Sequence, residues 1–286
     1  MRINYVTNAE LCEIIRENLY KIPHDIDGVI CIPRGGLFVG CVVAEFLHKP
    51  IYTIDTFLAG FSLGHGACVD DFPIAENKKY VVIDDSTTSA ANSMRVARKR
   101  LSETNASFVY VACVCDSDTQ ENVDIVLSSI PQFRLFELNL FRSAWVRHFI
   151  FDIDGVLCKD PDYGIDMNEE AYIQHMLTAP PKLLPQYRVM ALCTHRLLKY
   201  AKYTEEWLKS NSVEYGTLWM LDFESMEEKV SKLNTNEYLN MKSDTYMKYG
   251  NDVLLFVESN WNESVRIYNN THKPVLCTDR NILLQD

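Results

Sequence analysis

The residues with the clearest chemical potential are two acids that follow an apolar run near the middle of the chain. In the segment HFIFDIDGVLC, the apolar run ends in Asp152, and Asp154 follows two residues later. If the run is a strand, both carboxylates emerge at its carboxyl end, where open α/β sheets place their chemistry. An ionised carboxylate can act as a nucleophile at neutral pH, and a second acid can carry a proton. An Asp pair can also merely cap a turn, but the intact FxxDxDGVL pattern favours the chemical reading.

A second acidic pair lies in the first half of the chain. Asp84 and Asp85 end the apolar run of KKYVVIDDSTTSAANSM, and a loop of small residues and a helical pattern follow. Two adjacent carboxylates can accept hydrogen bonds from the vicinal hydroxyls of a ribose. The loop and the helix N-terminus can present N–H groups to a phosphate, and hydroxyl side chains add further donors: Ser86, Thr87, Thr88 and Ser89.

A third motif precedes this pair by about 50 residues. The run GVICI leads into Pro33, Arg34, Gly35 and Gly36. Glycines allow the backbone to approach an anion closely, and the guanidinium adds positive charge. The two motifs together predict a site for a ribose bearing phosphate groups.

These residues must be positioned by parallel sheets, because both halves alternate β-branched runs with helical patterns. The expected strands are Gly28 to Ile32, Pro50 to Asp55, Tyr80 to Asp84, Phe108 to Cys115, His148 to Asp152, Arg188 to Cys193, Gly216 to Leu221, Val253 to Glu258 and Pro274 to Cys277. The expected helices of the first half are Ala9 to Tyr20, Leu37 to Leu47 and Ser89 to Leu101. The fold class is therefore α/β, with two domains over residues 1–143 and 144–286.

Composition excludes several classes of protein. The 286 residues are 47% hydrophobic and 23% charged, and no apolar run approaches the roughly 20 residues of a membrane helix. The N-terminus lacks the progression of a secretory signal, and the 9 cysteines form no CxxC pair, so we expect a cytoplasmic protein with reduced cysteines. The net charge of −11 disfavours nucleic acid as a partner. The basic cluster Arg95, Arg98, Lys99 and Arg100 is expected to be a solvated helix face.

The segment around Asp152 resembles the first motif of the haloacid dehalogenase superfamily, and the resemblance covers about Trp145 to Asp286. It implies a fold of that type, in which Asp152 attacks phosphorus while Asp154 protonates the leaving oxygen and later activates water. It also implies that Thr194 binds a phosphoryl oxygen. The implied lysine is Lys242, with Lys248 and Lys232 as rivals.

The last implied motif is the metal site. Glu258 ends the run VLLFVE, where the family more often has paired Asp residues. It would hold Mg²⁺ together with Asp152 and the backbone carbonyl of Asp154. About 40 residues separate Asp154 from Thr194 and about 48 separate Thr194 from Lys242, which leaves room for only a minimal cap and predicts access for bulky substrates.

The first half, from about Tyr5 to Phe141, resembles type I phosphoribosyltransferases, and this implies phosphoribosyl pyrophosphate as substrate. Two features depart from that family. Ala90 and Ala91 stand where its phosphate loop usually has glycines, and the expected mobile loop, Phe57 to Phe72, contains no Lys or Arg. Candidate acceptor bases are Asp55, Asp116 and Asp118, each of which can equally be structural.

The whole chain also resembles fused phosphoribosyltransferase and phosphatase proteins implicated in installing ribofuranose on bacterial surface polysaccharides. The segments that carry this resemblance include FELNLF, APPKLLP, MKSDTY and LFVESN. It implies transfer of 5-phosphoribosyl to a glycan acceptor, followed by removal of the phosphate. Two alternatives stay open. One is a nucleobase or orotate-type phosphoribosyltransferase with an attached phosphatase, and the other is a module that senses phosphoribosyl pyrophosphate and regulates the phosphatase.

Overall fold

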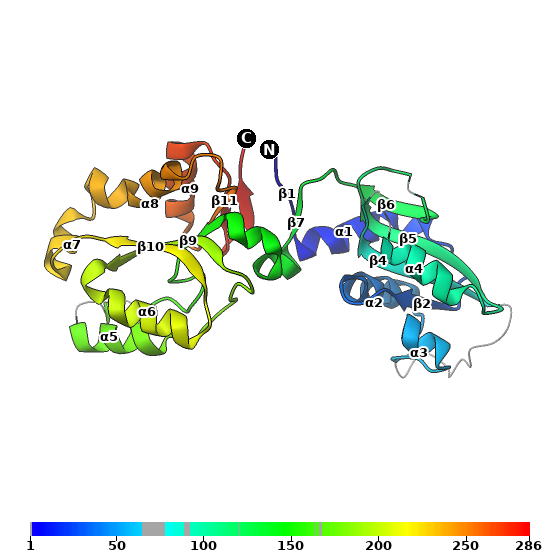
Figure 1. Ribbon diagram of the computed structural model, residues 1–286. Coiled ribbons are helices and arrows are strands. Elements are labelled where there is room, and N and C mark those ends of the chain that lie inside the picture. Colours follow the sequence, from blue (N-terminus) through cyan, green and yellow to red (C-terminus); the bar gives the residue numbers. More distant parts are fainter. Residues whose placement is uncertain (1, 65–77, 89–91, 120, 163, 166–167) are drawn as a thin grey trace. The chain divides into compact units, whose positions relative to one another are not determined.

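The computed structural model describes residues 2–64, 78–88, 92–119, 121–162, 164–165 and 168–286 (Figure 1). The chain divides into two compact units, Ile3–Glu137 and Leu138–Asp286. The division lies a few residues before the expected boundary at residue 143. Each unit has a largely parallel sheet flanked by helices, so the chain has the α/β class.

The first unit contains a five-stranded parallel sheet covered on both faces. Its order is β3 (Ile51–Thr53), β2 (Gly28–Cys31), β4 (Lys79–Ser86), β5 (Ser107–Cys115) and β6 (Ile125–Ser129). One face packs against α1 (Asn8–Asn18) and α2 (Gly35–Leu47), and the other against α3 (Ile54–Leu58) and α4 (Asn92–Leu101). Such double coverage explains why β2 is buried at every position and reads as a continuous apolar run. A short pair, β1 (Asn4–Val6) and β7 (Arg134–Phe136), stands apart from this sheet.

The second unit contains a six-stranded sheet. Its order is β10 (Tyr215–Leu221), β9 (Val189–Leu197), β8 (Phe149–Phe151), β11 (Leu255–Glu258), β12 (Val275–Cys277) and β13 (Ile282–Leu284), with only the last strand antiparallel. The α-helices are α5 (Glu169–Thr178), α6 (Ala201–Ser210), α7 (Met226–Lys232), α8 (Asn236–Lys248) and α9 (Trp261–Thr271). A short 3₁₀ helix of the first unit spans Leu19–Lys21. Others span Glu137–Arg142, Ala144–His148 and Leu198–Tyr200.

The expected strands all have counterparts, with shifted ends. The sequence patterns missed β1, β6, β7 and β13, because each is a short strand at a sheet edge, where fewer neighbours demand apolar side chains. The core cysteines Cys31, Cys113, Cys115 and Cys193 are buried, as expected. The basic residues Arg98 and Arg100 of α4 pair with Asp124 and Asp55, which lie far from them in the sequence. Within the described ranges, no helix combines the length and the apolar character needed to cross a membrane.

Candidate functional site

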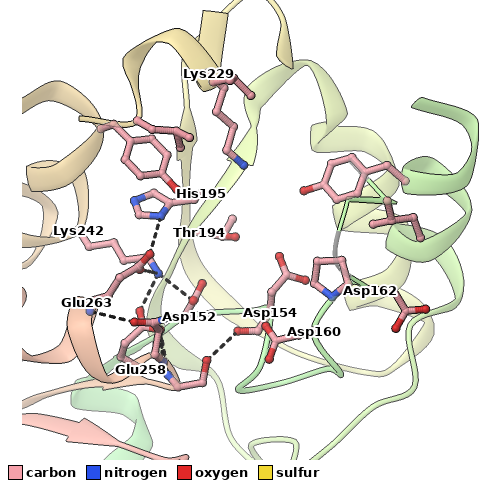
Figure 2. Close-up of a pocket in the computed structure, with 18 of the residues that line it drawn as sticks. Asp152, Asp154, Asp160, Asp162, Thr194, His195, Lys229, Lys242, Glu258 and Glu263 are labelled. Atoms are coloured by element: carbon pink, nitrogen blue, oxygen red, sulfur yellow. Dashed lines mark hydrogen bonds and ion pairs between the residues drawn. The ribbon is translucent and has the colours of Figure 1, made fainter. Parts of the chain in front are cut away.

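The candidate active site of the second unit lies where three neighbouring strands present polar side chains (Figure 2). Asp152 directly follows β8, Glu258 is the last residue of β11, and Thr194 lies on β9. β8 pairs with β9 on one side and with β11 on the other, so the chain reverses its direction across the sheet at β8. Open α/β sheets bind their ligands at such a switch point.

One expected position is wrong in detail. We expected Thr194 at the end of its strand, but β9 continues to Leu197, because Leu197 still pairs with Leu221 of β10 beyond an irregularity in the register. Thr194 is 1% exposed and borders the cavity described below. Its side chain therefore faces the site from within the strand.

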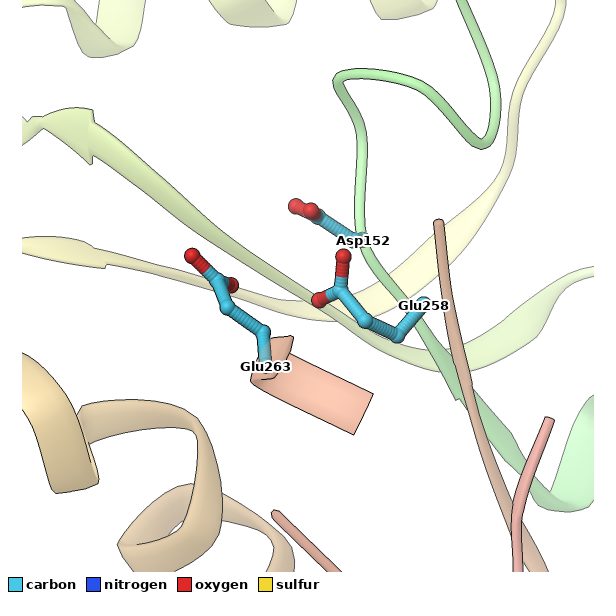
Figure 3. Close-up of side chains that lie close together, drawn as sticks. All are labelled: Asp152, Glu258 and Glu263. Atoms are coloured by element: carbon cyan, nitrogen blue, oxygen red, sulfur yellow. The ribbon is translucent and has the colours of Figure 1, made fainter. Parts of the chain in front are cut away.

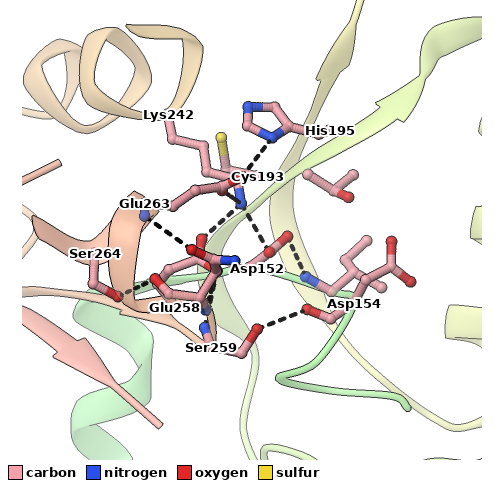
Figure 4. A network of polar contacts seen from close by, with 12 residues as sticks. Asp152, Asp154, Cys193, His195, Lys242, Glu258, Ser259, Glu263 and Ser264 are labelled. Carbon is pink, nitrogen blue, oxygen red and sulfur yellow. Dashed lines mark hydrogen bonds and ion pairs between the residues drawn. The ribbon is translucent and has the colours of Figure 1, made fainter. Parts of the chain in front are cut away.

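Three carboxylates surround one buried ammonium group (Figure 4). The Lys242 Nζ donates to Asp152 Oδ2 at 2.8 Å, to Glu258 Oε2 at 2.6 Å and to Glu263 Oε2 at 2.5 Å. One oxygen from each carboxylate lies within 4.8 Å of the others (Figure 3). With all groups ionised, three negative charges face one positive charge, so a divalent cation with a preference for hard oxygen ligands, such as Mg²⁺, fits this cluster.

The pKa values within the cluster reflect this excess of negative charge. Burial raises the pKa of Asp152 well above its usual range, the Lys242 ammonium opposes the rise, and the neighbouring carboxylates add to it. Burial also raises the pKa of Glu258, again against the pull of Lys242. A bound cation would relieve both carboxylates, since positive charge favours their ionised forms.

The backbone after β11 fixes the orientation of Glu258. The N–H groups of Ser259 and Asn260 donate to Glu258 Oε1 at 2.9 and 3.0 Å. The Ser259 hydroxyl reaches the Asp154 backbone carbonyl at 3.4 Å. Gly155 adopts φ +77°, and a Cβ there would lie 2.2 Å from the Ser259 Oγ. The DGV turn therefore needs glycine both for its conformation and for this close contact.

Glu263 is a member of the cluster that sequence reasoning missed. It lies in the first turn of α9, and the Asn260 side chain caps that turn by accepting from the Glu263 N–H. The available signal was the spacing ESNWNE, in which a helix that starts directly after a strand folds an acid back toward the strand end. His195 was also given no role, yet its Nδ1 lies 3.3 Å from Glu263 Oε1 and its ring stacks on Tyr238.

The three rival lysines lie in different surroundings. Lys242 occupies the acidic cluster with a side chain only 4% exposed. Lys248 lies over the Trp219 ring at 4.2 Å, and Lys232 pairs with Glu228 and Glu237. Of these three, Lys242 is the one in contact with Asp152.

The Asp154 carboxylate is turned toward Arg196 and is not one of the three clustered carboxylates. Arg196 Nε and Nη2 donate to its two oxygens at 2.9 and 2.6 Å. Burial opposes ionisation, but the guanidinium outweighs it and holds the pKa of Asp154 far below its usual range. Among the expected metal ligands, Asp154 can therefore contribute only its backbone carbonyl in this arrangement. To act as an acid, its carboxylate must first receive a proton.

A cavity of about 560 Å³ opens over these residues. Two short segments line its walls: residues 160–162, 164 and 165 with Tyr172 of α5, and the region from α7 to Tyr238 of α8. The volume lies within the range of pockets that take small molecules. The residues that line it are Asp152, Asp154, Asp160, Pro161, Asp162, Gly164, Ile165, Tyr172, Thr194, His195, Lys229, Val230, Leu233, Tyr238, Lys242, Glu258, Ser259, Asn260 and Glu263.

The acidic pair of the first unit also lies at a switch point. β2 pairs with β3 on one side and with β4 on the other, and the motif that begins at Pro33 follows β2. A Cβ on Gly35 would lie 2.3 Å from the Asp85 carboxylate, and one on Gly36 would lie 2.6 Å from a backbone carbonyl. The two sequence motifs are thus in direct contact, and glycine is what permits it.

Several expected positions in this unit need correction. Gly35 and Gly36 form the first turn of α2 rather than a loop, and Arg34 is its exposed N-cap. Asp84 and Asp85 lie inside β4, because pairing with β5 continues to Ser86. Thr87 is buried and Thr88 is exposed. Ser89, Ala90, Ala91 and the part of the expected mobile loop from residue 65 onward lie outside the described residues.

Arg134 is a buried cation that the sequence reasoning did not single out. It donates to the Thr87 carbonyl at 2.8 Å and pairs with Asp116 at 2.8 Å. Asp55, a second candidate base, pairs with Arg100 at 2.5 Å. These two carboxylates are therefore engaged with arginines, and Arg134 supports the backbone that follows the acidic pair.

The Asp84 carboxyl is expected to make stability depend on pH. Burial raises the pKa of Asp84 to about 7, the Ser93 hydroxyl opposes the rise, and Asp85 adds to it. Its contribution to stability is full below the unfolded pKa of about 4 and is lost as pH rises through about 7. Between pH 5 and 8 the wild type should lose about 3 kcal/mol of unfolding free energy relative to Asp84→Asn. Urea unfolding at several pH values measures this, and parallel pH profiles for the two proteins would contradict it.

The known proteins described below each match less than half of this chain. No family model matches the sequence. A curated relative, described as the transcriptional regulator GfcR of Methanococcoides burtonii, is 27% identical over 139 residues, which are 48% of this chain and 66% of that relative. The chain thus spans slightly less than two thirds of the regulator's length.

Several solved structures similar to the N-terminal half are described as phosphoribosyltransferases. The xanthine-guanine-hypoxanthine phosphoribosyltransferase of Helicobacter pylori is 15% identical, with a TM-score of 0.36, over 47% of this chain and 92% of its own. The purine phosphoribosyltransferase of Pyrococcus horikoshii is 16% identical, with a TM-score of 0.36, over 48% and 93%. The orotate phosphoribosyltransferase of Aeropyrum pernix is 16% identical, with a TM-score of 0.30, over 43% and 71%.

Proposed function

We propose that the chain is a bifunctional enzyme that transfers 5-phosphoribosyl from phosphoribosyl pyrophosphate to a glycan acceptor and then hydrolyses the 5-phosphate, leaving ribofuranose. The observation that carries the second step is the contact of Asp152, Glu258 and Glu263 with Lys242 at the switch point of the sheet. A buried carboxylate nucleophile beside an ammonium and a set of hard oxygen ligands suits phosphoester hydrolysis of the haloacid dehalogenase type.

In the hydrolytic step, a carboxylate oxygen of Asp152 forms a bond to phosphorus while the bond from phosphorus to the leaving oxygen breaks. Lys242 offsets the charge that gathers on the phosphoryl group, and the Thr194 hydroxyl donates to one of its oxygens. Asp154 passes a proton to the leaving oxygen and then takes one from the water that cleaves the aspartyl phosphate. Asp152, Glu258 and Glu263, together with the backbone carbonyl of Asp154, would hold Mg²⁺, which would neutralise developing charge when bound.

In the transfer step, Asp84 and Asp85 would accept hydrogen bonds from the ribose hydroxyls. The backbone after β4, with the hydroxyls of Ser86, Thr87, Thr88 and Ser89, would bind the 5-phosphate. Arg34 and the closely packed Gly35 and Gly36 would stabilise the departing pyrophosphate. The two steps are linked, since the first attaches a ribosyl group that already carries a 5-phosphate ester and the second hydrolyses that ester. Stripping this phosphate would destroy a nucleotide, so a non-nucleobase acceptor is the economical choice.

A second candidate is a module that binds phosphoribosyl pyrophosphate and regulates the phosphatase. The similarity to a transcriptional regulator of Methanococcoides burtonii favours it, as do the ion pairs of Asp116 and Asp55 with arginines. This alternative shares the donor site and the phosphatase but requires no acceptor.

Mass spectrometry of the wild type with phosphoribosyl pyrophosphate, Mg²⁺ and a panel of surface glycans tests the proposal. We expect glycans that gain a ribosyl group without phosphate, release of pyrophosphate, and loss of both when EDTA removes the metal. Excess Mg²⁺ should restore them. Binding of phosphoribosyl pyrophosphate without modification of any glycan would favour the regulatory module, and transfer to a purine or pyrimidine would favour a nucleobase enzyme.

A further inference from the structure

Arg134 lies at the start of β7, where its buried side chain contacts three separate segments of the first unit. Its Nη2 donates to the Thr87 carbonyl at 2.8 Å and lies 2.8 Å from Asp116 Oδ1, while its Nη1 donates to the Ile130 carbonyl at 3.1 Å. The Arg134 side chain is 3% exposed. Gln132 Nε2 also donates to Asp116 Oδ1, at 3.0 Å. Both terminal nitrogens of the guanidinium therefore have partners within the unit.

The three segments that Arg134 contacts each follow the carboxyl end of a strand. Thr87 comes directly after β4, Asp116 directly after β5 and Ile130 directly after β6. These three strands are neighbours in the parallel sheet. Open α/β sheets bind their ligands outside this edge, and the proposed donor site lies there. One planar guanidinium thus fixes the spacing of three strand ends at the edge that would hold the donor.

The contact with Thr87 concerns the segment proposed to bind the 5-phosphate. The Thr87 N–H donates to the Val114 carbonyl at 3.0 Å, and the Thr87 carbonyl accepts from Arg134, so the main chain of Thr87 is held on both sides. At the other end of the segment, the hydroxyl of Ser93 in the first turn of α4 donates to Asp84 Oδ2 at 2.6 Å. The segment that follows β4 is therefore anchored at Thr87 and again at Ser93.

Stability alone does not explain a buried guanidinium at this position. Removing it from water costs as much as or more than an ion pair returns, and Asp116 is itself partly exposed. Burial lowers the pKa of Arg134, and Asp116 opposes the shift only in part. The other two partners are backbone carbonyls, whose positions Arg134 fixes. A backbone that binds phosphate through its N–H groups needs such fixed positions, because preorganised donors bind an anion without first having to reorient.

We propose that Arg134 is a positioning residue for the donor, which holds the Thr87 carbonyl and thereby fixes the start of the segment that would bind the 5-phosphate of phosphoribosyl pyrophosphate. This inference rests on the proposed transfer function. It assigns the effect of Arg134 to one end of the ligand. The pyrophosphate end would instead meet Arg34, Gly35 and Gly36, and none of the Arg134 contacts described above leads to them.

Calorimetric titrations in Mg²⁺ with phosphoribosyl pyrophosphate and with pyrophosphate test this role, on an Asp152→Asn background so that the donor keeps its 5-phosphate. Arg134→Met removes the three contacts and should raise the Kd for phosphoribosyl pyrophosphate about 30-fold, as expected for the loss of one hydrogen bond to a charged group. The Kd for pyrophosphate should change by less than about 2-fold. Equal losses for the two ligands would show a merely structural role.

Arg98→Met is the matched control for this comparison. Arg98 also donates to a backbone carbonyl, that of Asn122, and pairs with an acid, Asp124. Asp124 directly precedes β6, so these contacts lie away from the carboxyl ends of the strands. Arg98→Met should therefore leave both affinities unchanged, and a loss equal to that of Arg134→Met would contradict a specific role for Arg134.

Two further variants keep the possible results distinct. If Arg134→Met does not fold, Arg134→Lys keeps the positive charge but cannot reach all three partners at once, and it should raise the Kd for phosphoribosyl pyrophosphate about 10-fold. Asp85→Asn on the same background identifies the binding that belongs to the donor site. An unchanged affinity in a folded Arg134 variant would overturn this inference and leave the donor site intact. If no binding depends on Asp85, the proposed transfer function fails, and this inference with it.

Discussion

Replacing Asp152 by asparagine is expected to stop phosphate removal while ribosyl transfer continues. The amide keeps the shape of the side chain but is a poor nucleophile, so kcat for phosphate release should fall by at least about 10⁴-fold. In the coupled reaction with phosphoribosyl pyrophosphate, the glycan product should then retain its 5-phosphate. Mass spectrometry of the product separates the phosphoribosylated from the ribosylated glycan.

Two variants make this result specific. Asp162→Asn changes an exposed carboxylate that lines the same cavity, and it should leave both steps close to wild type. Asp85→Asn should block the transfer step while hydrolysis of ribose 5-phosphate proceeds. If Asp152→Asn still yields a ribosylated product without phosphate, the two-step mechanism is wrong, whatever the wild type does.

The strand ends of the second unit's site could be predicted from the sequence, because an apolar run that stops at an acid marks the carboxyl end of a buried strand. Asp152 and Glu258 were located in this way, whereas β4 continues through Asp84 and Asp85 to Ser86. Their convergence follows from the switch points at β8 and β2, and that strand order is set by the whole sheet rather than by any local pattern.

The partners of these residues could not be predicted, because they depend on contacts across the fold. Arg196 is 42 residues from Asp154, and their meeting depends on the pairing of β8 with β9 and on the extension of β9 beyond Thr194. Arg134 is 47 residues from the Thr87 carbonyl it binds. Glu263 is the exception, because its place in the cluster could be predicted once α9 is recognised to start directly after the strand that ends at Glu258.

Catalysis and folding stability place opposing requirements on the acidic cluster. Catalysis calls for carboxylates close enough to hold a cation, and stability calls for their charges to be neutralised. The contacts of Lys242 with Asp152, Glu258 and Glu263 supply part of that neutralisation. Lys242 should therefore matter to folding as well as to turnover.

Lys242→Met is accordingly expected to destabilise the second unit in a way that Mg²⁺ partly reverses. Methionine has a similar length but no charge, and leaving buried carboxylates without their ammonium should cost about 3–5 kcal/mol of unfolding free energy in metal-free buffer. Mg²⁺ binds only the folded site, so it stabilises in proportion to the logarithm of its concentration above Kd. The more negative cluster of the variant should bind it more tightly than the wild type does.

Thermal and urea unfolding with and without Mg²⁺ measure this effect. Lys248→Met is the matched control, since Lys248 lies on the same helix but over the Trp219 ring, and it should change stability by less than about 1 kcal/mol. Phosphatase activity of Lys242→Met should stay low, by about 10²–10³-fold, even in saturating Mg²⁺, because the ammonium also offsets charge in the transition state. An equal loss of stability in both lysine variants, or no greater response to Mg²⁺ in Lys242→Met than in wild type, would show that the three carboxylates are not the metal site.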